Sequence, residues 1–88
     1  MGQATLLARL PSRDSRPNAD SLFRLGLSLS TACEAGRPDT VAAQALFELA
    51  ARLGSIEAKV YRRELSDEMD PADLIEAQQA VRDWLSAG

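Results

Sequence analysis

The chain has no histidine, and its 88 residues include a single cysteine, Cys33. Without histidine the chain lacks the most common general base and metal ligand, and a lone cysteine cannot form an internal disulfide. No phosphate-cradling glycine loop and no nucleophile elbow is present either. We therefore expect a non-catalytic protein that binds no cofactor and no metal ion.

Aromatic residues are scarce, at 5% of the composition, and alternating runs of Val, Ile and Thr are missing. Such alternation marks β-strands, whereas Leu and Ala at helical spacing are the main apolar residues in this chain. A core made mostly of Leu and Ala suits closely packed helices. We predict an all-α fold with about four main helices.

A long apolar run is missing as well. The first apolar stretch, residues 6–10, is interrupted by Arg9 and followed by Pro11, so it is too short for a membrane span or a signal segment. We expect a cytoplasmic protein that makes no contact with membranes.

Charge is spread unevenly, although the net charge is only −3. Residues 1–38 contain five Arg and three acidic residues, whereas residues 39–88 contain five basic and ten acidic residues. The acidic half would repel a phosphate backbone, and Arg62 and Arg63 stand close to acids such as Asp67 that would neutralise them. We therefore expect no binding of nucleic acid.

Proline, glycine and capping residues divide the chain into an N-terminal segment, residues 1–18, and a single helical domain, residues 19–88. The N-terminal segment has room for a short helix over 2–10 and continues as a polar linker over 11–18, which we expect to be mobile. The predicted main helices run from Asn18 or Asp20 to about Gly36, from Asp39 or Thr40 to about Leu53, from Ser55 to about Asp67, and from Pro71 onward.

Small residues recur through the middle of the chain, where they would let two helix backbones approach closely. They are Gly26, Gly36, Ala43, Ala50, Ala51, Gly54 and Ala58. The inward residues of the helix over 39–53 are predicted to be Ala42, Ala45, Leu46, Leu49 and Leu53. Trp84 is expected to cover the end of the core as a lid.

Segment 21–58 resembles the Sel-one-like repeat, a relative of the tetratricopeptide repeat. The matching residues are Leu25-Gly26, Asp39, Ala43, Leu46-Phe47, Ala50-Ala51, Gly54 and Ala58. The chain departs from the repeat at Ser21 and Leu29, where Ala and Tyr are preferred, and at Arg62-Arg63, where Leu-Gly is expected. The resemblance implies a bacterial protein with antiparallel helix hairpins of α-solenoid type: one full repeat, a degenerate half-repeat and a closing helix.

The leading functional hypothesis is a protein–protein interaction module, either an adaptor or a scaffold. The resemblance implies a concave binding surface on the first helix, formed by Asp20, Phe23, Leu27, Ser30 and Thr31. An apolar centre with a polar edge suits a peptide or a helix laid in a groove. Two alternatives stay open. Phe23 and Leu27 are ordinary core residues covered by the N-terminal segment, or stacked repeat ends make the chain a small homo-oligomerising structural protein, such as a homodimer.

Overall fold

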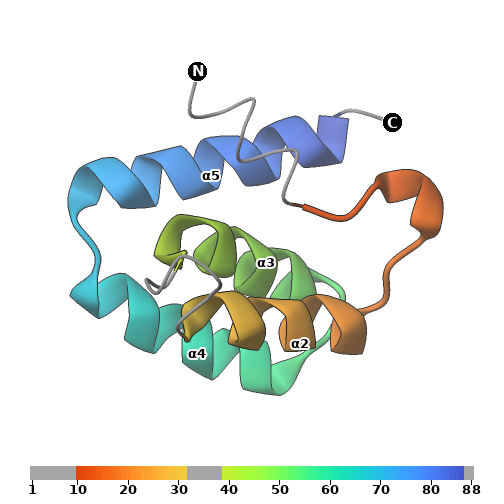
Figure 1. Ribbon diagram of the computed structural model, residues 1–88, viewed down its shortest axis with the longest axis horizontal. Helices are drawn as coiled ribbons and strands as arrows, with labels where there is room; N and C mark the ends of the chain where they lie inside the picture. Colours follow the sequence, from red (N-terminus) through yellow and green to blue (C-terminus); the bar gives the residue numbers. More distant parts are fainter. Residues whose placement is uncertain (1–9, 32–38, 87–88) are drawn as a thin grey trace.

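The computed structural model describes residues 10–31 and 39–86, which form one short 3-10 helix and four α-helices (Figure 1). The elements are η1 (Arg13–Ser15), α2 (Ala19–Ser30), α3 (Thr40–Arg52), α4 (Ile56–Glu68) and α5 (Pro71–Ser86). Residues 10–31 and 39–86 contain no strand. The predicted all-α fold is confirmed.

Three helices begin at the capping residues that the sequence indicates. Asn18 Oδ1 accepts a hydrogen bond from the Ser21 N–H at 2.8 Å, and the Asn18 N–H donates to Ser21 Oγ at 3.1 Å. The side chains of Asp39 and Ser55 each accept from the backbone N–H three residues further on. These bonds satisfy N–H groups that have no partner inside the helix. They also explain Ser21, where the resemblance leads one to expect alanine.

Helix α2 ends earlier than predicted, at Ser30 instead of near Gly36. The cap residue Thr31 is extended, and the hydroxyl groups of Ser30 and Thr31 donate to the carbonyl groups three residues before them, both at 2.9 Å. These side chains occupy carbonyl groups of the last helical turn, which favours the end of the helix there. Cys33, Gly36 and Pro38 lie outside the described residues.

Helix α3 lies at the centre of the fold. Figure 1 shows it between α5 on one side and α2 and α4 on the other, and each of these helices packs against it. Its buried residues are Ala42, Ala43, Gln44, Ala45, Leu46, Phe47, Leu49, Ala50 and Ala51. A helix that is apolar on nearly all sides is stable only when it is covered on nearly all sides. The composition of residues 40–52 therefore fixes α3 as the core helix.

Consecutive helices α4 and α5 do not pack closely against each other, although each packs against α3. The closing helix therefore covers α3 instead of pairing with α4. Of the three pairs of consecutive helices, α2 with α3 and α3 with α4 pack against each other, whereas α4 with α5 forms no comparable contact. A second hairpin, which a regular succession of repeats would contain, is not formed by these residues.

The contact between α2 and α3 depends on a small residue, as predicted. Gly26 is buried, and a Cβ atom placed on it would come within 2.7 Å of Cε1 of Phe47 and 2.9 Å of Cδ1. No ordinary side chain fits at that distance, so the absence of a side chain at residue 26 allows α2 to approach α3 this closely.

Two predictions about the turn between α3 and α4 are wrong. Leu53, expected to face inward, is 53% exposed because it caps α3 after the buried face has ended. Gly54 lies in the expected break between the two helices, but it does not serve close helix packing, since apart from its chain neighbours no atom lies within 4 Å of the Cβ that it lacks. Its φ of 110° is a left-handed conformation that glycine adopts without strain, so Gly54 is needed for the turn itself.

The segment before α2 lies against the C-terminal end of α5. Leu10 is buried in the core, and Trp84 Nε1 donates to the carbonyl oxygen of Pro11 at 2.7 Å. Arg13 donates to the Leu85 carbonyl oxygen, and its guanidinium carbon lies 5.4 Å from the centre of the Trp84 ring. This segment was expected to be a mobile linker, but it has defined contacts. Trp84 packs against the core and acts as the predicted lid.

Candidate functional site

The five residues predicted to bind a partner lie on α2 and its C-cap. They are Asp20, Phe23, Leu27, Ser30 and Thr31. Asp20 and Thr31 are exposed, whereas Phe23, Leu27 and Ser30 are half-buried. Asp20 is engaged by Arg24, with 3.0 Å between Nε and Oδ2, in an exposed ion pair. The predicted surface is therefore polar at its ends and apolar at its centre.

Phe23 belongs to a cluster of three aromatic rings contributed by α2, α3 and α4. Its ring centre lies 5.9 Å from that of Phe47 and 5.3 Å from that of Tyr61, and the Phe47 and Tyr61 ring centres are 5.6 Å apart. These distances are typical of favourable aromatic pairs. Tyr61 of α4 is thus a neighbour that the sequence did not suggest for Phe23.

One of the two alternatives makes the N-terminal segment the cover for Phe23 and Leu27. Its described part, residues 10–18, contacts the end of α5, and Leu10 joins the main core cluster. Leu6 and Leu7 lie outside the described residues. Besides Phe47 of α3, the aromatic ring that packs against Phe23 is that of Tyr61 on α4.

A hollow of about 160 Å³ lies beside the aromatic cluster. It is lined by Ser30, Phe47, Tyr61, Glu64, Leu65 and Glu68. Ser30 is one of the predicted partner-binding residues, so the structure brings one end of the predicted surface next to α4. The hollow combines an aromatic floor with two carboxylate side chains from α4.

Helix α4 and the turn before it expose several large apolar side chains, which we call the α4 apolar surface. Its members are Leu53, Ile56, Val60 and Tyr61. Ile56 is the most exposed, at 72%. A group of this kind on a small protein marks a site of contact with another molecule more often than an isolated exposed residue does. The sequence showed that these residues are apolar but not that they face outward.

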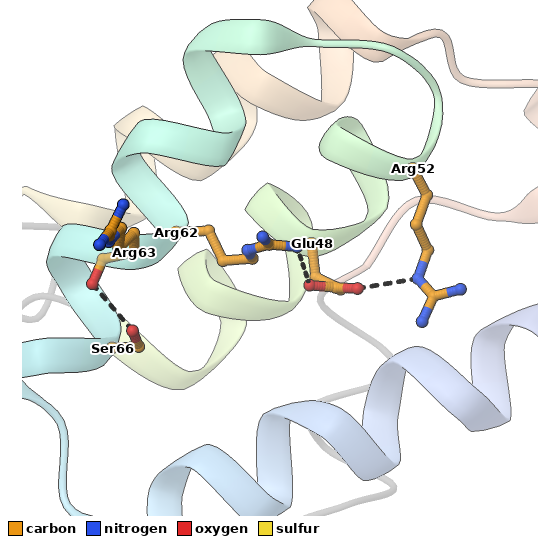
Figure 2. Close-up of polar contacts among 5 residues, drawn as sticks. All are labelled: Glu48, Arg52, Arg62, Arg63 and Ser66. Carbon is orange, nitrogen blue, oxygen red and sulfur yellow. Dashed lines mark hydrogen bonds and ion pairs between the residues drawn. The ribbon is translucent and has the colours of Figure 1, made fainter.

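A polar groove is lined by residues of α3, α4 and α5. Figure 2 shows Glu48 of α3 reaching between two arginines. Its Oε1 accepts from Arg62 of α4 at 2.8 Å, and its Oε2 accepts from Arg52 at 2.9 Å. Arg62 was expected to be neutralised by an acid on its own helix, such as Asp67, but it pairs with α3. Ser66, joined to Arg63 by a dashed line in Figure 2, donates to the carbonyl oxygen of Arg63 at 2.8 Å.

The groove consists of two adjoining hollows of about 380 and 590 Å³ that share three lining residues, Glu48, Gln78 and Val81. Gln44, one turn before Glu48 on α3, lines the smaller hollow and is only 8% exposed. Among the described residues, Gln44 Oε1 is a buried oxygen atom with no hydrogen-bond partner. We call this feature the Gln44–Glu48 groove.

The sequence contained a signal for this groove. Gln44 and Glu48 are the polar residues in the middle of an otherwise apolar helix, and their spacing of four places them on the same face. Polar groups on the face of a core helix need partners, because burial without them is costly. Which helices supply the walls could not be read from the chain, since that depends on where α4 and α5 pack.

The described residues contain no helix of the length and apolarity that crossing a membrane requires. In the same part of the chain, no three Cys, Asp or Glu side chains gather in a group that could hold a metal ion.

A comparison of the chain with protein-family models finds none that matches, and comparisons with curated proteins and with solved structures find no significant similarity.

Proposed function

We propose that this chain is a non-catalytic protein–protein interaction module of the Sel-one-like type. The observation that carries the proposal is the α4 apolar surface, four large side chains that stay exposed on a small protein. Removing such side chains from water on binding is favourable, at about 25 cal/mol for each Å² of apolar area buried. The close α2–α3 contact at Gly26 supports a repeat-like helix pair.

The binding face proposed here extends from the α4 apolar surface, through Tyr61, to the predicted residues of α2. Tyr61 provides the link, because it belongs to the exposed group and also contacts Phe23. Glu64 and Glu68 stand beside this link. An amphipathic helix or an extended peptide with apolar residues flanked by Lys or Arg has the complementary chemistry.

A charged substitution at Phe23 cannot test the proposed binding face, because a charge there would disrupt the aromatic cluster and with it the fold. The exposed isoleucines give a better pair of variants. Ile56→Glu places a charge on the proposed binding face, and Ile75→Glu places the same charge on α5, where the wild-type side chain is 63% exposed. Both variants are expected to keep the helical circular-dichroism spectrum and melting temperature of the wild type.

Affinity capture from the source cells, with wild type and both variants as bait, tests the proposal. A protein that binds the wild type and Ile75→Glu, but not Ile56→Glu, is the expected result. Capture of the same proteins by all three baits, or of none by the wild type, would contradict an interaction role for this face.

The alternative function, a homo-oligomer, uses the same apolar surface in a different way. It predicts a doubled mass in sedimentation experiments on the purified wild type, and a melting temperature that rises with protein concentration. The interaction module predicts a monomer until the partner is added. Ile56→Glu would return a dimer to monomer, so the same variant distinguishes the two functions.

A further inference from the structure

We propose that the Gln44–Glu48 groove binds a small organic carboxylate that carries a hydroxyl or amino group. This site is separate from the proposed protein-binding face: it lies between α3, α4 and α5, and its ligand is a small molecule. Three features of the groove lead to this ligand class: its charge, its buried amide and its apolar wall.

The charge of the groove is opposite to that of the protein. The charged residues that line its two hollows are Glu48, Arg52, Arg62 and Arg82, three bases against one acid, whereas the whole chain carries −3. A guanidinium has five N–H donors in a planar fork, so the single bonds from Arg52 and Arg62 to Glu48 leave donors for a further oxygen atom. A carboxylate matches that fork well.

Gln44 adds a requirement that a simple anion does not meet. Its Oε1 can only accept a hydrogen bond and is buried without a partner, and Gln44 is one of the residues that line the smaller hollow. A buried acceptor in this state destabilises the protein unless a donor reaches it. An O–H or N–H group on the ligand would supply the missing bond, which selects a hydroxy acid or an amino acid over a plain carboxylic acid.

Apolar side chains complete the groove. They are Leu74, Ala77, Val81 and Leu85 of α5. Hollows of about 380 and 590 Å³ fall within the range of about 300–1,000 Å³ that is typical of small-molecule sites. A few polar groups that fix orientation, set against an apolar wall, are the usual composition of such a site.

The test is a calorimetric titration of the purified protein at constant ionic strength with three related compounds. L-malate carries carboxylates and a hydroxyl group, succinate lacks the hydroxyl group, and dimethyl malate lacks the charges. We expect saturable binding of malate, binding of succinate about five- to tenfold weaker, and no binding of dimethyl malate. An absence of saturable malate binding up to 10 mM, roughly the upper limit for a specific small-ligand site, overturns the proposal.

Two variants assign the contacts. Gln44→Met keeps the volume and removes the amide, so it should reduce the preference for malate over succinate to about onefold while melting no lower than the wild type. Arg82→Gln, on the exposed wall, should weaken both diacids about three- to tenfold.

Arg24→Gln, on α2, removes the same charge from the exposed Asp20 pair and serves as the matched control. An equal loss of malate binding in Arg24→Gln and Arg82→Gln would show a non-specific charge effect and would contradict the site. A malate preference that survives Gln44→Met would also contradict it. Neither result depends on the protein-binding face, which Ile56→Glu tests separately.

Discussion

Helices α3 and α4 have the same length, thirteen residues, and opposite environments. Nine residues of α3 are buried, whereas Ala58 is the one buried residue of α4. Tertiary packing accounts for most helix stability in proteins, so α3 is held by its surroundings and α4 much less so. The difference divides the molecule into a part that maintains the fold and a part that presents side chains to solvent.

Three specific contacts tie α4 to the rest of the molecule. Ala58 packs into the core, Tyr61 joins the aromatic cluster, and Arg62 bonds to Glu48. Regions with few buried apolar contacts open at lower free energy than the core does. We infer that α4 exchanges its amide protons faster than α3, which suits a helix proposed to contact partners.

The largest expected effect comes from removing buried volume in α3. Leu46 is fully buried, so Leu46→Ala should lower the free energy of unfolding by about 2–5 kcal/mol. Val60→Ala, which removes apolar atoms from the exposed face of α4, should change it by less than about 0.5 kcal/mol. Urea denaturation followed by circular dichroism measures both.

If Leu46→Ala and Val60→Ala lower the free energy of unfolding equally, the contrast between α3 and α4 is wrong. A high cost for Val60→Ala in particular would show that the α4 apolar surface is covered in solution, as it would be in a homodimer. Dilution of the wild-type protein should then lower its melting temperature as well.

Close packing of α2 on α3 gives the second effect. In Gly26→Ala the new methyl group meets the ring of Phe47, and such overpacking costs about 1–3 kcal/mol even though alanine favours a helix. Gly54→Ala is the matched control, because that site has open space but a left-handed backbone, with an expected cost of about 1–2 kcal/mol.

Adding Phe47→Leu to each of these variants separates steric overlap with the ring from backbone strain as the cause of the lost stability. It should recover part of the loss caused by Gly26→Ala, since it makes room for the methyl group, and none of the loss caused by Gly54→Ala. A failure to recover any stability in the first pair would mean that the ring of Phe47 is not the obstacle.

Much of the fold could be predicted from the sequence, because it depends on local signals. Asn18, Asp39 and Ser55 mark helix starts through side chains that bond to nearby N–H groups, and the apolar pattern of residues 40–52 requires burial on all sides. Such features depend on residues a few places apart, so no knowledge of the rest of the molecule is needed.

The sites were harder to predict because they depend on the packing of distant helices. Phe23 was identified as part of a surface, but its neighbour Tyr61 lies on α4, a helix whose orientation the sequence does not determine. Glu48 and Arg62 stand fourteen residues apart and meet only because α4 packs on α3. The polar linker over 11–18 was misjudged for the same reason, since its contacts are with Trp84 and Leu85 at the far end of the chain.

The third prediction concerns Gln44, whose replacement should change stability less than the substitutions above and should raise it instead of lowering it. Replacing a buried acceptor that has no partner by an apolar side chain of similar volume should stabilise the protein by about 1–2 kcal/mol, so Gln44→Met should unfold at higher urea concentration. Gln78→Met, an exposed glutamine lining the same groove, should leave stability unchanged within about 0.5 kcal/mol. If Gln44→Met is destabilising, the amide has a partner in solution and its oxygen is not free to receive a ligand.

The smallest effect concerns the ion pair that joins α4 to α3. The partners Glu48 and Arg62 are 24% and 38% exposed, whereas those of the Asp20–Arg24 pair are both more than 60% exposed. Solvent screening is therefore weaker for the interhelical pair.

A double-mutant cycle with Glu48→Gln and Arg62→Gln should give a coupling energy of about 0.5–1 kcal/mol, against about 0.3 kcal/mol for Asp20→Asn with Arg24→Gln. Both couplings should shrink in 1 M salt, roughly the concentration at which exposed charges are fully screened, and the interhelical coupling should shrink less. Equal couplings would mean that Arg62 does not hold α4 to the core, so that the attachment of this helix rests on its apolar contacts, such as those of Ala58 and Tyr61.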